Sequence, residues 1–426
     1  MNIICLKSQA GFDLTKLIEK LDLEPNSTLT EPREGRNKGK ISLRGMKRTY
    51  QRNYNQREII LPAKYKGIRL YAVEGALVAE ELILTQKELC LIYTAKSKLL
   101  VPKLVERLLG IEQFQLVEPD PFVRLAQESN AFDPREMPVY GKGIEAGLLT
   151  HLPWQIYIIH AAWQRYLANP LDRIALRQLR VKVRRLRSCL TFVKPALRQD
   201  DAIAWQKRLR AQGEALGRLR EVDVALISLE HMQSSITQNR PKGGQLMQVL
   251  RSLQKKELAE IEPLASNEKI TLELMQLLMW LQGQPVAAAY SNMSWKKFLH
   301  CRCGQWSEAI MKWRYKHADF SNVEEDHKLR IKIKRFRYAL MCLPEINQDS
   351  GLMLRKLKRL QDVLGFIHDD YVNGQLVQEY KNRDEKLNYE IATFSGWESA
   401  KVAAALEQLP ELWQDFCQQL QEWKRR

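Results

Sequence analysis

The feature of the sequence with the clearest chemical content is a basic segment that occurs twice. Residues Arg177–Arg187 align with His327–Arg337 at an offset of 150 positions, and nearly every position matches in chemical type. If both segments are helical, spacings of three and four residues place cations on one stripe about 15 Å long. The planar guanidinium of arginine binds two phosphate oxygens at once, so such a stripe is suited to an anion with closely spaced charges.

The basic side chains of both segments are the predicted binding residues. They are Arg177, Arg180, Lys182, Arg184, Arg185 and Arg187 in the first copy, and His327, Arg330, Lys332, Lys334, Arg335 and Arg337 in the second. A second motif follows each copy, as Lys207–Gly217 and Arg355–Gly365. It adds a second set of candidates, namely Lys207, Arg208, Arg210, Arg355, Lys356 and Lys358. Two motifs repeated in the same order indicate a duplicated helical unit.

A charged helix face is often merely solvated, and this alternative must be weighed first. Solvated faces usually mix signs, because Glu and Lys four residues apart stabilise a helix whereas like charges destabilise it. Residues 173–187 hold seven Lys and Arg and no acid, and residues 327–337 hold six and no acid. The same self-repulsive stripe therefore occurs twice, which favours a polyanionic ligand over simple solvation.

Helical periodicity supports this placement of the cations. Apolar residues recur at spacings of three and four over 154–167, 174–193, 203–229 and 324–343, which predicts helices. Beside each basic stripe runs an apolar one, formed by Leu179, Val183, Leu186 and Leu190 and by Leu329, Ile333, Phe336 and Leu340. These apolar stripes should face a bundle core. The tryptophans at helical apolar positions, Trp154, Trp163, Trp295, Trp306 and Trp313, are interpreted as core residues rather than as surfaces for base stacking.

The first part of the chain has a different pattern. Short segments rich in β-branched and aromatic residues at 59–62, 67–73 and 88–93 predict strands, and 101–109 predicts a helix. The run 32–40 is interpreted as a mobile basic loop. We expect a mainly α protein: a small α+β domain over 1–140, joined through 117–122 and 133–147 to a helical domain over 148–426. The helical domain should contain two repeats, about 150–285 and 290–426.

Composition excludes several classes of protein. The 426 residues carry 67 Lys plus Arg and 50 Asp plus Glu, a formal charge of +17, and 45% are hydrophobic. This excludes a disordered tail and a disulfide-stapled miniprotein. No apolar run is long enough for a membrane span, and the N-terminal segment does not resemble a secretory signal, so a cytoplasmic location is expected. The seven cysteines are scattered without a C-x-x-C pair, and the cluster His300–Cys303 is too compact to hold zinc alone. No metal or cofactor is expected.

The repeated basic helices and the Leu-Gly segments that follow them resemble the CHAD family, the conserved histidine α-helical domain. The resemblance covers about residues 150–426. It implies a duplicated helical bundle in which basic residues of both halves line a cavity that binds inorganic polyphosphate, and an association with polyphosphate granules. Two departures stand out: the histidine that names the family is His327 in the second half but Arg177 in the first, and residues 1–140 lack the alternating Glu and Lys of a CYTH triphosphatase domain.

Three functions follow from these residues. The first is non-enzymatic binding of polyphosphate, with neither membrane attachment nor catalytic residues. The second is RNA or DNA binding through the same basic face. The third is metal-dependent phosphate hydrolysis, in which the acid pairs Glu221 with Asp223 and Asp369 with Asp370 would hold Mg²⁺; ion pairs between helices are the simpler interpretation of these acids.

Overall fold

The computed structural model describes residues 2–8, 13–21, 23, 30–43, 46–79, 82–119, 142–235, 244–264, 266–283, 285–316, 320, 323–342, 351–381 and 384–425. These residues form two compact units. Unit 1 contains Met1–Ala168 and Ala265–Asn292, and unit 2 contains Asn169–Leu264 and Met293–Arg426. No helix within the described ranges is long and apolar enough to cross a membrane.

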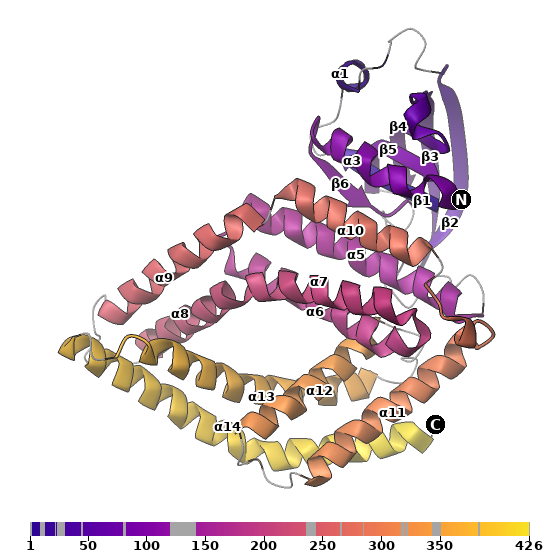
Figure 1. Ribbon diagram of the computed structural model, residues 1–426. Coiled ribbons are helices and arrows are strands. Elements are labelled where there is room, and N and C mark those ends of the chain that lie inside the picture. The colour runs from indigo at the N-terminus through magenta and orange to yellow at the C-terminus, as the bar shows by residue number, and fades with distance from the viewer. Residues whose placement is uncertain are drawn as a thin grey trace. The chain divides into compact units, whose positions relative to one another are not determined.

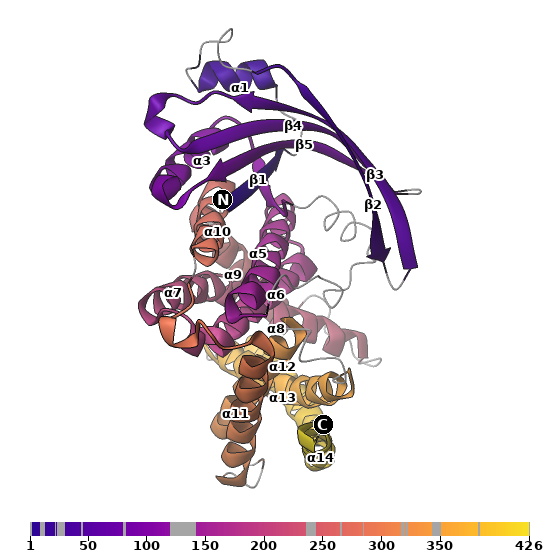
Figure 2. The same cartoon turned by 90° about the vertical axis from the view of Figure 1, so that its right-hand side faces the viewer.

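Unit 1 is built on a six-stranded antiparallel sheet in the order β2-β3-β4-β5-β1-β6. The strands are β1 (Asn2–Ser8), β2 (Arg33–Leu43), β3 (Met46–Ile59), β4 (Ile68–Ala79), β5 (Leu82–Tyr93) and β6 (Phe114–Val117). Figure 2 shows the strong curvature of this sheet. The helices of unit 1 are α1 (Leu14–Lys20), α3 (Val101–Leu109), α5 (Ile144–Ala168) and α10 (Asn267–Gln282).

The predicted strands and helix of this region are present, with one correction. Residues 68–73 of the predicted strand 67–73 lie in β4, and 88–93 lie in β5. The predicted strand 59–62 overlaps β3 at Ile59 alone, and α3 has the predicted bounds. The run 32–40, expected to be a loop, forms most of β2 and pairs with β3 from Arg33↔Gln56 to Leu43↔Met46. Its glycines and cations are poor strand formers, but pairing with a neighbouring strand outweighs that preference.

The two units group the helices differently from the predicted domains. Helices α5 and α10 pack against each other and against the sheet unit, through α3 and β6. From the sequence, both helices are assigned to the first helical repeat. The division into compact units does not test where the repeats begin, so the domain boundary at 140–148 stays a prediction. Most residues of the predicted linker stretches 117–122 and 133–147 lie outside the described residues.

Unit 2 is helical. Its helices are α6 (Arg173–Val193), α7 (Gln199–Ala215), α8 (Gly217–Ser235), α9 (Gln245–Ile261), α11 (Trp295–Lys316), α12 (Val323–Cys342), α13 (Gly351–Gln378) and α14 (Glu385–Arg425). Figure 1 shows α13 running beside α14. The segment 203–229, predicted as one helix, is two helices, because α7 ends at Ala215 and α8 starts at Gly217. Its counterpart in the second half is the uninterrupted α13.

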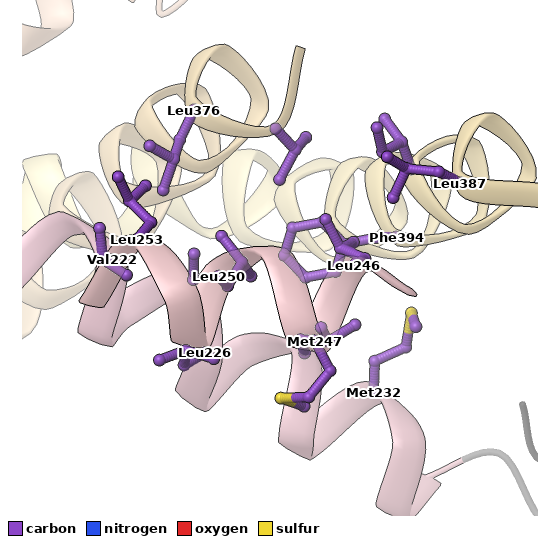
Figure 3. Close-up of a cluster of buried hydrophobic side chains, with 14 residues drawn as sticks. Val222, Leu226, Met232, Leu246, Met247, Leu250, Leu253, Leu376, Leu387 and Phe394 are labelled. Carbon is purple, nitrogen blue, oxygen red and sulfur yellow. The ribbon is translucent and has the colours of Figure 1, made fainter. Parts of the chain in front are cut away.

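Burial follows the predicted apolar stripes. Each of the eight stripe residues on α6 and α12 is at most 1% exposed. Trp163 and Trp295 are both 4% exposed, which places these two tryptophans in the core as expected. A second part of the core joins α8 and α9 to α13 and α14 through side chains that include Leu226, Leu250 and Phe394 (Figure 3). The basic helix α6 packs against α7 and the basic helix α12 packs against α13, so each lies beside the helix that carries its second motif.

Candidate anion-binding site

Helices α6 and α12 carry the basic segments and pack against each other within unit 2. The α6 helix starts at a clear capping residue, since the carboxylate of Asp172 accepts hydrogen bonds from the backbone N–H groups of Ile174 and Ala175 at 2.8 and 3.1 Å. The α12 helix has Glu324, Glu325 and Asp326 in its first turn, where acids favour the positive end of the helix dipole. Both helices then present their cations beside the buried stripe.

Interactions between the two helices come in pairs that the repeat offset relates. The charge of Arg180 acts on Lys334, and the equivalent pair is Arg330 with Arg184. The charge of Arg335 acts on Arg187, and the equivalent pair is Arg185 with Arg337. In a two-fold arrangement every interaction occurs twice, with the roles of the two copies exchanged. A local two-fold axis therefore relates α6 to α12.

Arg184 and Lys334 occupy equivalent positions in the two copies, and the charge of Arg184 acts on Lys334. Burial is the main cause that lowers the pKa of the Lys334 ammonium, and Arg184, Arg330, Arg335 and Arg180 lower it further. A single lysine thus lies among four guanidinium groups from both halves of the repeat. Such a concentration of half-buried positive charge is costly without a counter-ion, and an anion of matching shape would relieve it.

Two residues on neighbouring helices join this cluster. Arg220 of α8 interacts electrostatically with Arg177 and Arg184, and His368 of α13 interacts with Arg330, Lys334 and Arg184. Arg220 and His368 were not selected as binding residues from the sequence. The signal was present, because each residue follows the second repeated motif at the same distance. We use the term basic cluster for Arg180, Arg184, Arg220, Arg330, Lys334, His327 and His368.

Histidines occupy in the second half the positions that arginines occupy in the first. The Nδ1 atoms of His327 and His368 are 2.8 Å apart, so one imidazole donates a hydrogen bond to the other. Burial, followed by the charges of Arg330, His327, Lys334 and Arg184, lowers the pKa of His368 to about 3. The pKa of His327 is lowered as well, first by burial and then by Arg330 and Lys334. The corresponding residues of the first half are the arginines Arg177 and Arg220.

The acids near the cluster form ion pairs. Asp369 lies 3.6 Å from the guanidinium of Arg330, and burial outweighs that contact so that the pKa of Asp369 is raised. Asp223 lies 3.8 Å from Arg173 and also accepts a hydrogen bond from Gln254. These contacts join α13 to α12 and α8 to α6, as the ion-pair interpretation of the acids expects. These acids therefore neutralise part of the positive charge of the basic helices, and cations remain in excess.

Several predicted binding residues lie elsewhere on the helices. Lys182 and Lys332 project about 160° away from Arg184 and Lys334 around their helices, on the other flank of the apolar stripe. The second set, Lys207, Arg208, Arg210, Arg355, Lys356 and Lys358, is spread over the surfaces of α7 and α13. Arg210 pairs with Glu214, Lys356 with Asp415 and Lys358 with Asp362. Among these three, only Arg210 acts on a cation of the basic stripe, Arg187.

Replacing Lys334 by methionine is expected to stabilise the ligand-free protein. Methionine keeps most of the side-chain volume and removes a buried charge from among four arginines, so the free energy of unfolding should rise by about 1–2 kcal/mol. Urea denaturation at low salt would measure the change. Lys332→Met, two residues away on the other flank, should alter stability by less than about 0.5 kcal/mol. A loss of stability in Lys334→Met would mean that the ammonium has a compensating partner.

Comparison with known proteins agrees with this architecture. The CHAD domain family model matches residues 158–378, which are 221 of the 426 residues. The fold is similar to the CHAD domain from the plant Ricinus communis, with 22% identity and a TM-score of 0.51, over 65% of this chain and 94% of that chain. It is also similar to PptA from Streptomyces chartreusis, with 15% identity and a TM-score of 0.50, over 64% of this chain and all of that chain. No curated protein matches the chain.

Fold and site together define a helical protein with a duplicated basic helix. The chain belongs to the CHAD domain family, which is associated with polyphosphate binding. The resemblance inferred from the two basic segments is confirmed, as is the mainly α fold with an N-terminal region built on a sheet.

Proposed function

We propose that the protein binds inorganic polyphosphate through the basic cluster without hydrolysing it, and that this binding associates it with polyphosphate granules. The observation that carries the proposal is the electrostatic interaction of Lys334 with Arg184, Arg180 and Arg330, which brings cations of both repeats together. Cations from both halves converge there, so one linear chain of phosphates would neutralise both helices at once. Family membership supports the same ligand.

The burial of the arginines in the basic cluster favours a thin ligand. The side chain of Arg330 is only 13% exposed, and the side-chain Nε atoms of Arg180 and Arg330 are enclosed without a hydrogen-bond partner among the described residues. A ligand reaches such groups only if its phosphates are not shielded by bulky neighbours. Polyphosphate is an unbranched chain of phosphates, whereas a nucleic-acid duplex carries its phosphates on a wide rod. The basic cluster therefore favours polyphosphate over duplex DNA.

The ion pairs that the acidic residues form with arginines favour binding without catalysis. Asp369 and Asp223, which a hydrolase would need for Mg²⁺, contact Arg330 and Arg173. A carboxylate beside a guanidinium is a poor ligand for a metal ion, because the positive charge of the arginine repels the ion. We expect no release of phosphate from polyphosphate or nucleoside triphosphates in the presence of Mg²⁺ or Mn²⁺.

Titration of the full chain with long-chain polyphosphate, duplex DNA and tRNA at matched phosphate concentration tests the proposal. Polyphosphate should bind most tightly, and its affinity should increase with chain length. With about five cations engaged, the logarithm of the binding constant should fall with the logarithm of salt concentration at a slope of about −3 to −4. Equal or tighter binding of nucleic acid would overturn the proposal in favour of an RNA- or DNA-binding protein. Phosphate release that is lost in Asp369→Asn would favour a hydrolase.

A further inference from the structure

The sheet of unit 1 brings together three potential metal ligands that are far apart in the sequence. Strands β1 and β5 are antiparallel, and their register places Cys5 opposite Cys90. Glu88 lies two residues before Cys90, on the same face of β5, because side chains alternate along a strand. The two sulfurs and a carboxylate oxygen all lie within 4.8 Å of one another. Within the described residues this is the one group of three His, Cys, Asp or Glu side chains that is so close.

Strand geometry argues against a relaxed disulfide at this position. Cβ atoms of directly opposed residues in an antiparallel pair are about 4.5–5.5 Å apart, whereas a disulfide needs about 3.5–4.5 Å. Neither Cys5 nor Cys90 is in a disulfide, although their sulfurs are 2.8 Å apart. Two thiolates on a tetrahedral zinc ion, with Zn–S bonds of about 2.3 Å, are about 3.8 Å apart. Side-chain rotation that separates the sulfurs by about 1 Å would therefore create room for a metal between them.

Charge balance supports a divalent cation at the same place. As ligands of a metal ion, two thiolates and the Glu88 carboxylate would carry three negative charges in a buried position, since Cys5 is 2% and Glu88 1% exposed. Lys7 is directly opposite Glu88 in the register and supplies one positive charge. A divalent ion brings the total to zero, which is the condition for burying ionised groups at acceptable cost. The half-buried Cys90 gives the ion access from solvent.

We propose that Cys5, Glu88 and Cys90 form a zinc-binding site, with a water molecule as the fourth ligand. Sulfur and carboxylate oxygen are ligands that zinc prefers, and cysteine disfavours magnesium and calcium. The site links the first strand of the chain to β5 near the middle of the sheet, so zinc binding adds to the stability of unit 1. This proposal is independent of the basic cluster, which belongs to unit 2.

Cobalt substitution tests the site, because Co²⁺ bound by thiolates gives an intense near-ultraviolet charge-transfer band that nitrogen and oxygen ligands do not give. The full chain should be prepared free of polyphosphate, which itself binds divalent cations. We expect one Co²⁺ per chain, a thiolate band that Zn²⁺ abolishes, and a higher Tm with Zn²⁺ than with chelator. Cys5→Ser and Cys90→Ser should each weaken Co²⁺ binding and reduce the band by at least about half, and Glu88→Gln should weaken binding by about tenfold or more.

Matched controls are provided by two other buried cysteines, Cys189 and Cys303. Their serine variants should keep the full band and stoichiometry. Circular dichroism and polyphosphate binding check that each variant is folded, and if Cys5→Ser is unfolded the half-buried Cys90 provides the test. An unchanged band in folded Cys90→Ser would overturn the proposal, and so would the absence of a thiolate band in the wild type. A chain that is lighter by two hydrogens and binds no metal would show a disulfide instead.

Discussion

Replacing Arg184 and Lys334 together by glutamate is expected to abolish polyphosphate binding, with affinity falling by at least about a thousandfold. The two side chains occupy equivalent positions in the two repeats, and reversing both charges lowers the net charge by four units where cations of both halves interact. Each lost charge-assisted contact to phosphate costs about 1.5–3 kcal/mol, and the new carboxylates add repulsion. Isothermal titration calorimetry with long-chain polyphosphate at constant salt would measure the loss.

A control with the same charge change separates local contacts from net charge. Arg251→Glu with Lys255→Glu alters two exposed cations one helical turn apart on α9 and should reduce affinity by less than about threefold. The Tm of Arg184→Glu with Lys334→Glu should stay within about 2 °C of the wild type, because the substitution removes repulsion among like charges. Wild-type affinity in this variant, or an equal loss in the control, would remove the basic cluster from the binding site.

The sequence alone would direct such a test to Arg180 and Arg330, at the centre of each basic stripe. The structure gives these two arginines additional roles in the fold. Arg180 donates a hydrogen bond of 2.7 Å to the carbonyl oxygen of Gly213, and Arg330 pairs with Asp369. Glutamate at either position would remove a contact that joins two helices, so a loss of binding could reflect a loss of structure. Arg184 and Lys334 avoid that ambiguity.

Local periodicity predicted the helices of the site well, because the burial of a helix face depends on residues only three or four positions apart. Leu179, Val183, Leu329 and Ile333 are buried as expected, and their cationic neighbours are placed accordingly. The same reasoning failed for Arg33–Leu43, since the strand β2 exists through its pairing with β3. A segment of weak intrinsic preference takes its structure from its neighbour, which sequence patterns within the segment do not contain.

Relations between distant segments were beyond the sequence patterns. The two stripes were found, but their meeting at Arg184 and Lys334 depends on how α6 crosses α12. Arg220 and His368 were overlooked because each stands alone in a segment of mixed charge. The grouping of Cys5 with Cys90 depends on strand register over 85 positions, so a search for closely spaced cysteines could not detect it. In each case the residues are brought together by the packing of helices or the pairing of strands that are distant in the sequence.

The second half has histidines where the first half has arginines, so we expect the affinity for polyphosphate to depend on pH through the second half only. Binding a polyanion beside His327 and His368 should raise their lowered pKa values and draw protons onto the pair, so affinity should rise as pH falls. The groups that face the pair are Arg330 and Lys334 on α12 and Arg184 on α6, all positive, and Asp369, which adjoins His368 in the chain. Because the rings share a hydrogen bond, the protons belong to the pair rather than to one ring.

Without ligand, the same pair should make the fold less stable in acid. Both folded-state pKa values lie below the value near 6.5 of an unfolded histidine, so the folded chain binds fewer protons than the unfolded one. The contribution of the pair to stability is therefore fully present above about pH 6.5 and is lost as pH falls from there toward the pKa of about 3 of His368. The Tm of the ligand-free protein should fall over that interval, and saturating polyphosphate should reduce the fall.

Converting the pair to arginines, with His327→Arg and His368→Arg together, should make the second half resemble the first and remove this linkage. The wild type should bind polyphosphate about tenfold to a hundredfold more tightly at pH 6 than at pH 8, and the arginine variant should change by less than about threefold. Calorimetry in buffers of different ionisation enthalpy would count the protons taken up. Lys334→Arg serves as the control for proton uptake by the lysine, whose pKa is also lowered. Equal uptake by the wild type and the histidine variant would show that the pair keeps its charge on binding, and its role would then be limited to packing between α12 and α13.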